Sequence, residues 1–325
     1  MDDPVYRDIL ADIANMYYFQ EITQNAIGQA LGLSRIKVYR LLKEARDSGV
    51  VEITIHRSRP RNDQLEQELK ERFGLKDALV LATGGLGENG IWRGVGEIAA
   101  RYLERLLKDN STIAICLGRS TYEVVQAVRS NLRANVRIAQ ALGSIPFAIQ
   151  ELDSSTLARQ LAQKLGGEVL YLPSPMIADS PEAAGVLRRQ RDIERTLAAA
   201  AEADLALVGI GNLDPTQSRL VHAANLTPEQ LAALIAQGAV GDIAGQILTA
   251  DGSLSGNGLT ERIIGLTLDE LKRIPTVIAV AFGQAKTAAI LGALRKGAVD
   301  VLCTDDSTAS EVLRMAGPAA QKGGA

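Results

Sequence analysis

Apolar positions in the first fifty residues recur at the three- and four-residue spacing of amphipathic helices. Residues 5–20 carry such a stripe and predict a first helix. A second helix is predicted over residues 24–31, with Thr23 as its N-cap. A third is predicted to start at its N-cap Ser34 and to end at about residue 48. Three short helices in a row indicate a small helical domain at the N-terminus.

The second and third predicted helices are close enough in sequence to pack against each other. Gly32 between them permits a tight turn. Their predicted contact buries five apolar side chains, Ala26, Ala30, Leu33, Val38 and Leu42. A short strand, "VVEITIH", is expected over residues 50–56 and could support a wing, and "RSRPR" follows as a basic linker.

A charged helix is predicted after this linker, in the segment "NDQLEQELKERFG". Leu65, Leu69 and Phe73 form one apolar stripe at four-residue spacing. The stripe either packs on the domain that follows or forms a seam between two copies of the chain.

From residue 76 onward the pattern changes to short apolar runs that alternate with helical segments. The runs "DALVLA", "STIAICLG", "DLALVGIG" and "TVIAVAFG" are almost continuously apolar, which is typical of buried parallel strands. The alternation predicts an α/β domain with a Rossmann-like, mostly parallel sheet covered by helices. Glycines follow several of these runs, namely Gly118, Gly143, Gly209, Gly211 and Gly283. Ligands of open α/β sheets bind at the carboxyl ends of strands, so these turns are candidate binding loops.

Length and composition agree with two globular domains, since the chain has 325 residues and is 46% hydrophobic. The N-terminus has no apolar signal core and no run is long enough to span a membrane, so a cytoplasmic protein is expected. The two cysteines, Cys116 and Cys303, are isolated in apolar runs and are expected to be buried thiols. With two distant histidines they form no metal-binding pattern, and neither a metal nor a cofactor is expected.

The net charge of −3 hides a basic segment. Residues 20–61 hold eight Lys or Arg and four Asp or Glu. Two helices joined by a glycine turn, the second rich in cations, form a helix-turn-helix pattern. The side chains expected to face the DNA from the start of the third helix are Arg35, Lys37, Tyr39 and Arg40, and Arg57, Arg59 and Arg61 could add contacts to the backbone. Arg35 could read a base or contact a phosphate, and the alternative for the whole helix is a solvated face.

These residues carry a family resemblance. The segment "ITQNAIGQALGLSRIKVYRLLKEARDSGVVEITI" resembles the DNA-binding domain of the SorC family of bacterial sugar-responsive transcription regulators. The likeness continues through "IAICLGRSTYEVVQAV" and "IAVAFGQAKTAAILGALRKGAVDVLCTDDSTASEVL" and covers nearly the whole chain. It implies a helix-turn-helix domain over residues 1–58, a linker helix over 59–75 and an effector domain over 76–325.

The resemblance also implies partners. The effector domain of the family is similar in fold to glucosamine-6-phosphate deaminase and ribose-5-phosphate isomerase, and its usual ligands are phosphorylated sugars. The expected partners are therefore double-stranded operator DNA, a phosphorylated sugar or polyol, and further copies of the chain in a homodimer or homotetramer.

A phosphate site is expected where "LGRSTYEVV" joins a strand to a helix. Gly118, Ser120 and Thr121 would present backbone N–H groups and hydroxyls at a helix N-terminus. Arg119 either adds charge or points to solvent. Lys286 begins another helix, where a cation is unfavourable unless it faces an anion. By resemblance, Lys286 occupies the position that contacts the effector phosphate.

Other side chains are candidates for the sugar itself. Asp242 is a candidate for hydroxyl recognition, whereas Asp251 stands in a turn pair "DG". Asp153 either accepts a hydroxyl or caps the following helix, and Gly143 and Ser144 would line the same cleft.

One position departs from the pattern of some relatives, which carry a basic residue just before the glycine of this turn. This chain has Leu142 there, so a Schiff base at that position is not available. The expected effector is singly phosphorylated or unphosphorylated, unless Arg119, Arg188, Arg189 or Arg219 compensates.

Two other classes of protein are alternatives to a regulator. A sugar-phosphate isomerase or deaminase of the same fold needs a positioned acid and base, and His222, the only histidine of that domain, is expected on the surface. A protein-interaction adaptor would lack salt-sensitive affinity for DNA. The helix-turn-helix pattern favours the regulator, so no catalytic residue is expected.

Overall fold

The computed structural model describes residues 4–51, 59–130, 132, 134–145, 150–255 and 258–317. The chain divides into two compact units, Met1–Ser58 and Arg59–Ala325.

The first unit contains three helices, α1 (Pro4–Tyr18), α2 (Gln24–Leu31) and α3 (Arg35–Asp47). Both predicted N-caps are confirmed: Thr23 Oγ1 accepts from the Ala26 N–H at 3.3 Å, and Ser34 Oγ accepts from the Lys37 N–H at 3.2 Å. Gly32 turns the chain between α2 and α3 at φ 67°, a left-handed conformation that favours glycine. The predicted strand over 50–56 lies mostly outside the described residues.

The core of this unit differs in part from the prediction. Val38 and Leu42 are buried as expected, but Ala26 and Ala30 are exposed. Ile27 is fully buried in their place, and Gly28 lies so close to α3 that an added Cβ would stand 2.6 Å from the Leu33 carbonyl oxygen. Ile27 is buried in preference to the two alanines because burying the larger side chain removes more apolar surface from water.

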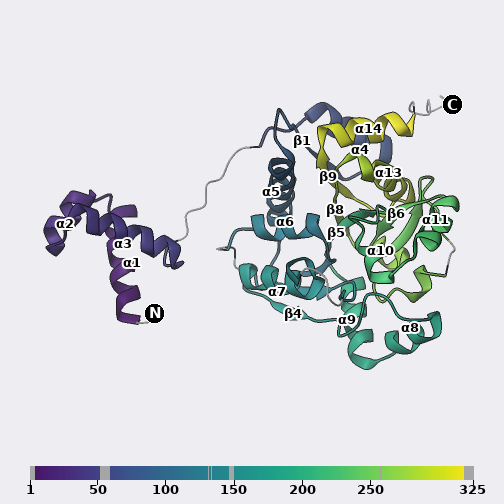
Figure 1. The fold of residues 1–325 in the computed structure, drawn as a ribbon, viewed down its shortest axis with the longest axis horizontal. Helices are drawn as coiled ribbons and strands as arrows, with labels where there is room; N and C mark the ends of the chain where they lie inside the picture. The colour runs from purple at the N-terminus through teal and green to yellow at the C-terminus, as the bar shows by residue number, and fades with distance from the viewer. Residues whose placement is uncertain are drawn as a thin grey trace. The chain divides into compact units, whose positions relative to one another are not determined.

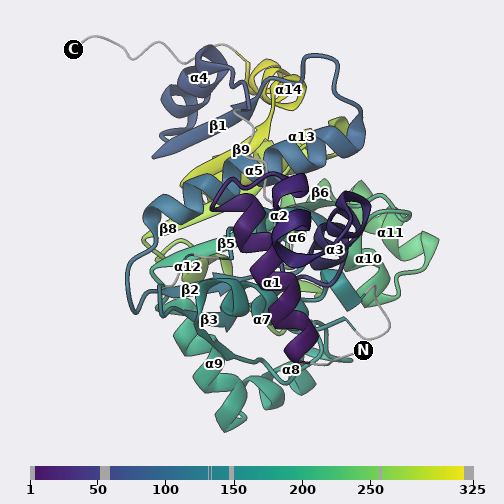
Figure 2. The same ribbon diagram turned by 90° about the vertical axis from the view of Figure 1, so that its left-hand side faces the viewer.

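The second unit is built on a sheet with seven parallel strands in the order β1-β9-β8-β5-β2-β3-β4 among the described residues. Figure 2 shows this order from β1 near the top to β3 below. The strands are β1 (Asp77–Leu81), β2 (Thr112–Ile115), β3 (Arg137–Gln140), β4 (Glu168–Leu170), β5 (Leu205–Asn212), β8 (Thr276–Val280) and β9 (Val301–Asp305). A hairpin of β6 (Ala239–Ile243) and β7 (Gln246–Thr249) joins the end of β5 in antiparallel fashion. The predicted mostly parallel α/β fold is therefore confirmed.

Helices cover both faces of the sheet (Figure 1). A separate cluster of buried apolar side chains lies under each layer. One face carries α5 (Glu88–Leu106), α6 (Arg119–Ala127) and α7 (Ser154–Leu165). The other carries α4 (Asp63–Phe73), α9 (Arg191–Ala201), α13 (Thr287–Lys296) and α14 (Asp306–Ala316). The remaining helical segments are η1 (Gln150–Leu152), α8 (Pro181–Arg188), α10 (Arg219–Ala224), α11 (Pro228–Ala236), η2 (Thr260–Arg262), α12 (Leu268–Leu271) and η3 (Gln284–Lys286).

The segment expected as a linker helix, α4, lies within the second unit. Leu69 is fully buried there, and Leu65 and Phe73 pack against the same core cluster. Arg72 donates to the carbonyls of Ala316 and Gly317 at the end of α14, both at 2.8 Å. The apolar stripe of α4 is therefore used inside the chain.

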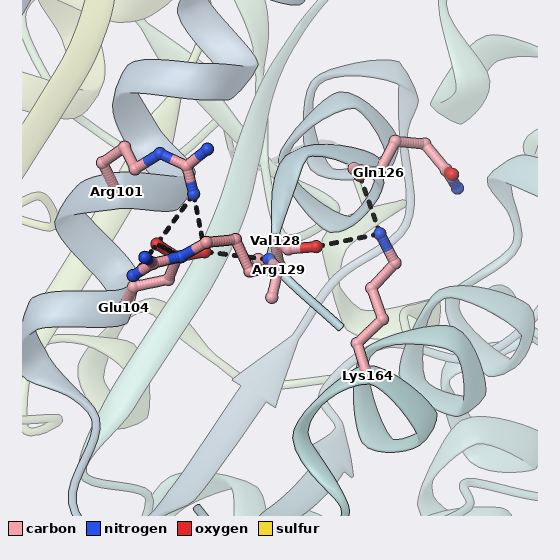
Figure 3. Close-up of polar contacts among 6 residues, drawn as sticks. All are labelled: Arg101, Glu104, Gln126, Val128, Arg129 and Lys164. Atoms are coloured by element: carbon pink, nitrogen blue, oxygen red, sulfur yellow. Dashed lines mark hydrogen bonds and ion pairs between the residues drawn. The ribbon is translucent and has the colours of Figure 1, made fainter. Parts of the chain in front are cut away.

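A polar cluster ties α5, α6 and α7 together at the end of α6 (Figure 3). The Glu104 side chain is only 2% exposed and accepts from Arg101 and Arg129 at 2.9–3.0 Å. Lys164 of α7 donates to the Gln126 and Val128 carbonyls at 2.7 and 3.0 Å. These bonds satisfy carbonyl groups that a helix end leaves unpaired, and they fix the helix whose other end reaches the candidate site.

Candidate functional site

The outer face of α3 is the first candidate site. Arg35, Lys37, Arg40 and Lys43 are all exposed. Ile36 and Tyr39 are also exposed, at 65% and 53%, although both are large and partly apolar. The opposite stripe is buried in the unit's core, so α3 has one structural face and one free cationic face. In the part of the chain that the structure describes, no ion pair neutralises these four cations.

The two predicted cap residues of this site have structural roles. The hydroxyls of Thr23 and Ser34 are engaged by the first turns of α2 and α3. Both caps fix the first turn of their helix, and the first turn of the second helix is the part that meets DNA in helix-turn-helix motifs.

The expectation that Arg59 and Arg61 contact a DNA backbone is not supported. Arg59 forms a two-bond ion pair with Glu97 of α5, at 2.6 and 3.2 Å. Arg61 pairs in the same way with Glu66 of α4, at 2.6 and 2.5 Å. Both cations are therefore neutralised within the second unit, while Arg57 lies outside the described residues.

The second candidate site is a cavity of about 410 Å³ in the second unit. It lies beyond the carboxyl ends of β2, β5 and β8, where the strand-end rule places ligands. Its volume suits a small metabolite. Seven of the predicted effector residues line it: Gly118, Arg119, Ser120, Gly209, Gly211, Asp242 and Lys286.

The turn from β2 into α6 supplies one wall. Gly118 has φ 131°, which L side chains rarely adopt, and no side-chain hydrogen bond caps α6. The first N–H groups of a helix lack intrahelical partners, so this end suits an anion. Ser120 lines the cavity, whereas Thr121 does not; the Thr121 hydroxyl is fully buried beside it without a hydrogen-bond partner among the described residues.

Two cations meet at one aromatic ring that also lines the cavity. Arg119 Cζ lies 5.0 Å and Lys286 Nζ 5.6 Å from the centre of the Trp92 ring, within the range of cation–π attraction. Phe282 holds the indole from the side at a ring distance of 4.3 Å. The exposed Arg119 also pairs with Glu123 at 3.1 Å, so its charge stays at the cavity mouth.

Asp242 and Lys286 form a coupled pair in the cavity wall. Burial raises the pKa of the Asp242 carboxyl to about 6, although the Gly245 N–H and the Lys286 ammonium both act to lower it. Burial lowers the pKa of Lys286 to about 8, and Asp242 opposes this change. Each group thus carries a charge that its surroundings solvate poorly, which favours a ligand with complementary groups.

The β5–β6 pairing brings Asp242 into place. Gly211 stands opposite Asp242 in the register, and a Cβ on Gly211 would collide with the Asp242 carboxylate. Asp242 Oδ2 accepts from the Gly245 N–H at 3.0 Å, which fixes the carboxyl. Gly209 has open space around its Cα, so the backbone itself forms part of the wall.

Besides Thr121, three predicted residues do not line the cavity. A Cβ on Gly143 would meet the Pro175 carbonyl, so this glycine serves close packing. Ser144 donates to Asp153 Oδ2 at 3.1 Å, and Asp153 also caps α7 through the Ser155 N–H at 3.0 Å. The capping alternative for Asp153 therefore describes its contacts, and the expectation that Gly143 and Ser144 line the cleft is wrong for the described cavity.

Several lining residues were missed. Trp92 is the only tryptophan of the chain and lies one turn into α5, but it is far in sequence from the glycine turns, so it was not predicted. Asn212 directly follows Gly211 at a strand end and could have been found by the strand-end rule. Other missed residues are Glu88, Leu152, Met176, Thr216, Gln217 and Ser218.

The arginines that could compensate for the missing cation at Leu142 lie in different places. Leu142 lines the cavity, as do Arg119 and Arg219. Arg188 instead donates to the Gly265 carbonyl. His222 is exposed, as expected, and does not line the cavity.

Two further properties of the described residues bear on chemistry. They hold no group of three His, Cys, Asp or Glu side chains that could bind a metal ion. Burial, together with the nearby Asp242, raises the pKa of the Cys116 thiol to about 12, so it lines the cavity as a neutral group.

No described helix has both the length and the apolar character to cross a membrane.

Known proteins resemble this chain over most of its length. Residues 60–314 match the family model Sugar-bind, described as "Putative sugar-binding domain". The chain is 33% identical over 316 residues to the transcriptional regulator LsrR of Enterobacter sp. (strain 638), covering 95% of this chain and 94% of that protein. It is 29% identical over 308 residues to the sorbitol operon regulator of Klebsiella pneumoniae, covering 94% and 98%.

Solved structures agree. The full-length sorbitol operon regulator SorC from Klebsiella pneumoniae matches with a TM-score of 0.72 and 28% identity, over 96% of this chain and all of that one. A sugar-binding domain of a transcriptional repressor from Vibrio fischeri matches with a TM-score of 0.72 and 30% identity, over 79% of this chain. These relatives are transcriptional regulators and not enzymes. The chain belongs to the SorC family of sugar-binding transcriptional regulators.

Proposed function

We propose that this protein binds operator DNA through α3 and controls a carbohydrate-utilisation operon in response to a phosphorylated sugar or polyol. The effector binds in the cavity beyond β2, β5 and β8. The observation that carries the proposal is the meeting of Arg119, Lys286 and the uncapped start of α6 at one cavity, on a chain that also carries a free cationic helix face.

The DNA-binding part of the proposal is supported by α3. Arg35 and Arg40 are exposed cations near the start of the helix, and Tyr39 stands beside them with 53% of its surface free. Guanidinium groups at this place can pair with guanine edges or with phosphates. The names of the two relatives, a transcriptional regulator and an operon regulator, support the same role.

The effector part is supported by charge. A phosphate monoester carries close to two negative charges at neutral pH. Arg119, Lys286 and the first N–H groups of α6 would attract and bind such an anion. The lack of a cation at Leu142 favours a single phosphate group over two. Asp242 and Asn212 offer an acceptor and a donor for sugar hydroxyls.

Self-association completes the proposal. Helix-turn-helix modules bind paired half-sites, so a homodimer is the smallest assembly that fits, and a homotetramer would pair two such sites. A regulator of this kind works where the chromosome is, in the cytoplasm.

Fluorescence anisotropy on labelled DNA from upstream of the protein's own gene cluster tests the proposal. The wild type should bind with an affinity that falls steeply between roughly 50 and 200 mM salt. One member of a panel of sugar and polyol phosphates should then change that affinity. Absence of DNA binding at both salt concentrations would contradict the DNA-binding part.

Variants separate the two parts. Arg35→Ala/Arg40→Ala should weaken DNA binding by at least about 30-fold per binding module, since each of the two lost contacts costs about 1–3 kcal/mol. The matched control Arg7→Ala/Arg189→Ala removes two exposed arginines elsewhere and should leave specific binding nearly unchanged. Equal losses in both variants would mean that α3 is not the recognition helix.

Lys286→Gln tests the cavity by calorimetry. It should weaken effector binding at least tenfold, because a buried charge-assisted bond is worth about 1.5–3 kcal/mol, and it should leave effector-free DNA binding intact. Lys272→Ala, at the exposed end of α12, is the control. An unchanged effector affinity in Lys286→Gln would place the phosphate elsewhere.

A further inference from the structure

The first turn of α14 is bonded to two separate loops. It begins with Asp305, the N-cap, and Asp306, the first helical residue, and neither side chain lines the cavity. The loop after β8 leads through Gly283 to Lys286, and the loop after β1 begins near Thr83 and leads into α5. Each of the two carboxylates is linked to one of these loops.

The Asp305 carboxylate acts on the β8 loop through Thr308. Both residues are buried, with 1% and 0% of their surface exposed. Asp305 Oδ2 accepts from the Thr308 hydroxyl at 2.7 Å, and Asp305 Oδ1 accepts from the Thr308 N–H at 2.9 Å. An ionised carboxylate can only accept, so the Thr308 hydroxyl donates to it and keeps its lone pairs for another donor. That donor is the Gly283 N–H, at 2.7 Å.

Gly283 transmits this constraint to Lys286. Its φ of 103° is one that L side chains rarely adopt, and it turns the chain out of β8 towards α13. The Gly283 carbonyl accepts from the Lys286 N–H at 2.9 Å. Three hydrogen bonds in series therefore link a buried carboxylate to the backbone of the lysine in the cavity wall.

Asp306 holds the other loop directly. Its Oδ1 accepts from the Thr83 hydroxyl at 2.7 Å, and its Oδ2 accepts from the Thr83 N–H at 3.0 Å. Gly84 and Gly85 follow at φ 43° and 85°, and α5 then brings Trp92 to the cavity. The two bonds restrict the start of a stretch in which glycine leaves the backbone free.

The two loops meet at one aromatic contact. The rings of Trp92 and Phe282, the residue before the β8 turn, have their centres 4.3 Å apart. Lys286 Nζ, from the same loop, lies 5.6 Å from the centre of the Trp92 ring. The relative position of the two loops therefore decides whether the ammonium group and the indole are in contact.

Binding side chains work only when the residues around them hold them to within about 0.5 Å. We propose that these bonds make the first turn of α14 a positioning element, which sets Lys286 against Trp92 without touching the effector. The positioning residues are Asp305, Asp306 and Thr308. The inference rests on the proposed function for the role of Lys286, and it adds how the rest of the fold controls that site.

A spectroscopic double-mutant cycle in the full-length protein tests the inference without any effector. Lys286→Gln removes a cation beside the sole tryptophan and should change its emission intensity. In Thr308→Val, which exchanges the hydroxyl for a methyl group, the same replacement should produce about half that change or less. Thr308→Ser keeps the hydroxyl and should retain the wild-type change.

Two further variants separate positioning from a general loss of stability. Asp306→Ala acts on the other loop, at a half-buried site whose helix keeps its N-cap, and should reduce the emission change in the same way. Ser310→Ala is the matched control, since its exposed hydroxyl donates within α14, to the Asp306 carbonyl at 2.8 Å. A thermal melt shows which variants are folded, and Asp306→Ala decides if Thr308→Val is not. An undiminished emission change in the folded variants, or no change on Lys286→Gln in the wild type, would overturn the inference.

Inorganic phosphate, used as the probe, connects this contact with binding. It should change the Trp92 emission of the wild type where sodium chloride of equal ionic strength does not. Thr308→Val should raise the half-saturating phosphate concentration at least about threefold, because a displaced cation loses part of a charge-assisted bond. Equal phosphate affinities in the two proteins would overturn the role of Thr308. A wild type that ignores phosphate, with the emission cycle as expected, would contradict the phosphate site of the proposed function and leave the positioning role standing.

Discussion

Arg59, the first residue of the second unit, is joined to Glu97 of α5 by two hydrogen bonds of 2.6 and 3.2 Å. Nine residues before Glu97, on the same helix, Glu88 lines the cavity, and Trp92 lies between them in the wall. One helix therefore connects the cavity with the start of the second unit.

This connection predicts a role in coupling. Arg59→Ala should leave effector affinity and effector-free DNA affinity close to wild type but change the effect of the ligand on DNA binding by roughly fivefold, within the range of residues that modulate coupling. The measurement is DNA anisotropy with and without saturating effector. The exchanged pair Arg59→Glu/Glu97→Arg should restore the response, and Arg314→Ala, which breaks an exposed pair with Glu311, should not alter it. A wild-type response in Arg59→Ala would rule out this route.

Trp92 should report effector binding directly. It is the only tryptophan, and the cations 5.0 and 5.6 Å from its ring centre are those expected to turn towards a phosphate. Emission should change on titration with effector and saturate at the affinity found by calorimetry. Trp92→Phe should abolish the signal and weaken binding about two- to fivefold, because cation–π pairs contribute about 0.5–1 kcal/mol. A flat emission titration where calorimetry shows binding would contradict the assignment.

Asp242 should make stability depend on pH in an unusual direction. Its carboxyl keeps a proton up to about pH 6 in the folded chain, whereas the ordinary pKa is 3.8. The contribution of this group is therefore fully present below pH 3.8 and is lost as pH rises through 6. The melting temperature of Asp242→Asn, relative to wild type, should rise between pH 4 and 6 and then level off. The exposed Asp269→Asn is the control, and parallel curves for Asp242→Asn and wild type would disprove the shift.

Glu104 should show the opposite dependence. Burial alone would raise its pKa, but hydrogen bonds from the Arg129 N–H and the Arg101 and Arg129 guanidinium groups outweigh burial and lower it. Its stabilisation is present at neutral pH and is lost as the carboxyl becomes protonated in acid. Glu104→Gln should lower the free energy of unfolding by about 2 kcal/mol at pH 7, measured by urea denaturation, and by less at pH 4. Glu311→Gln, in an exposed pair with Arg314, should cost much less, because solvent screens exposed ion pairs. Similar losses in the two variants would refute the importance of the cluster in Figure 3.

The sequence by itself determined the features that depend on neighbouring residues. Thr23 and Ser34 cap their helices through bonds to N–H groups three residues away, and Gly32 turns the chain through its own φ. Such contacts are local, so the helix-turn-helix pattern and the alternation of strands and helices could be predicted. The cationic face of α3 followed from the same spacing.

Only the tertiary structure decided which residues share the cavity. Gly118 and Gly143 carry the same signal, a glycine after a strand, yet one opens onto the site and the other packs on Pro175. Trp92 meets Lys286 across almost 200 residues of sequence because α5 packs over β8 and its neighbour β9, and Lys286 follows β8. The order of strands is set by the packing of whole layers, and that order, not position along the chain, brings side chains from distant segments to one cavity.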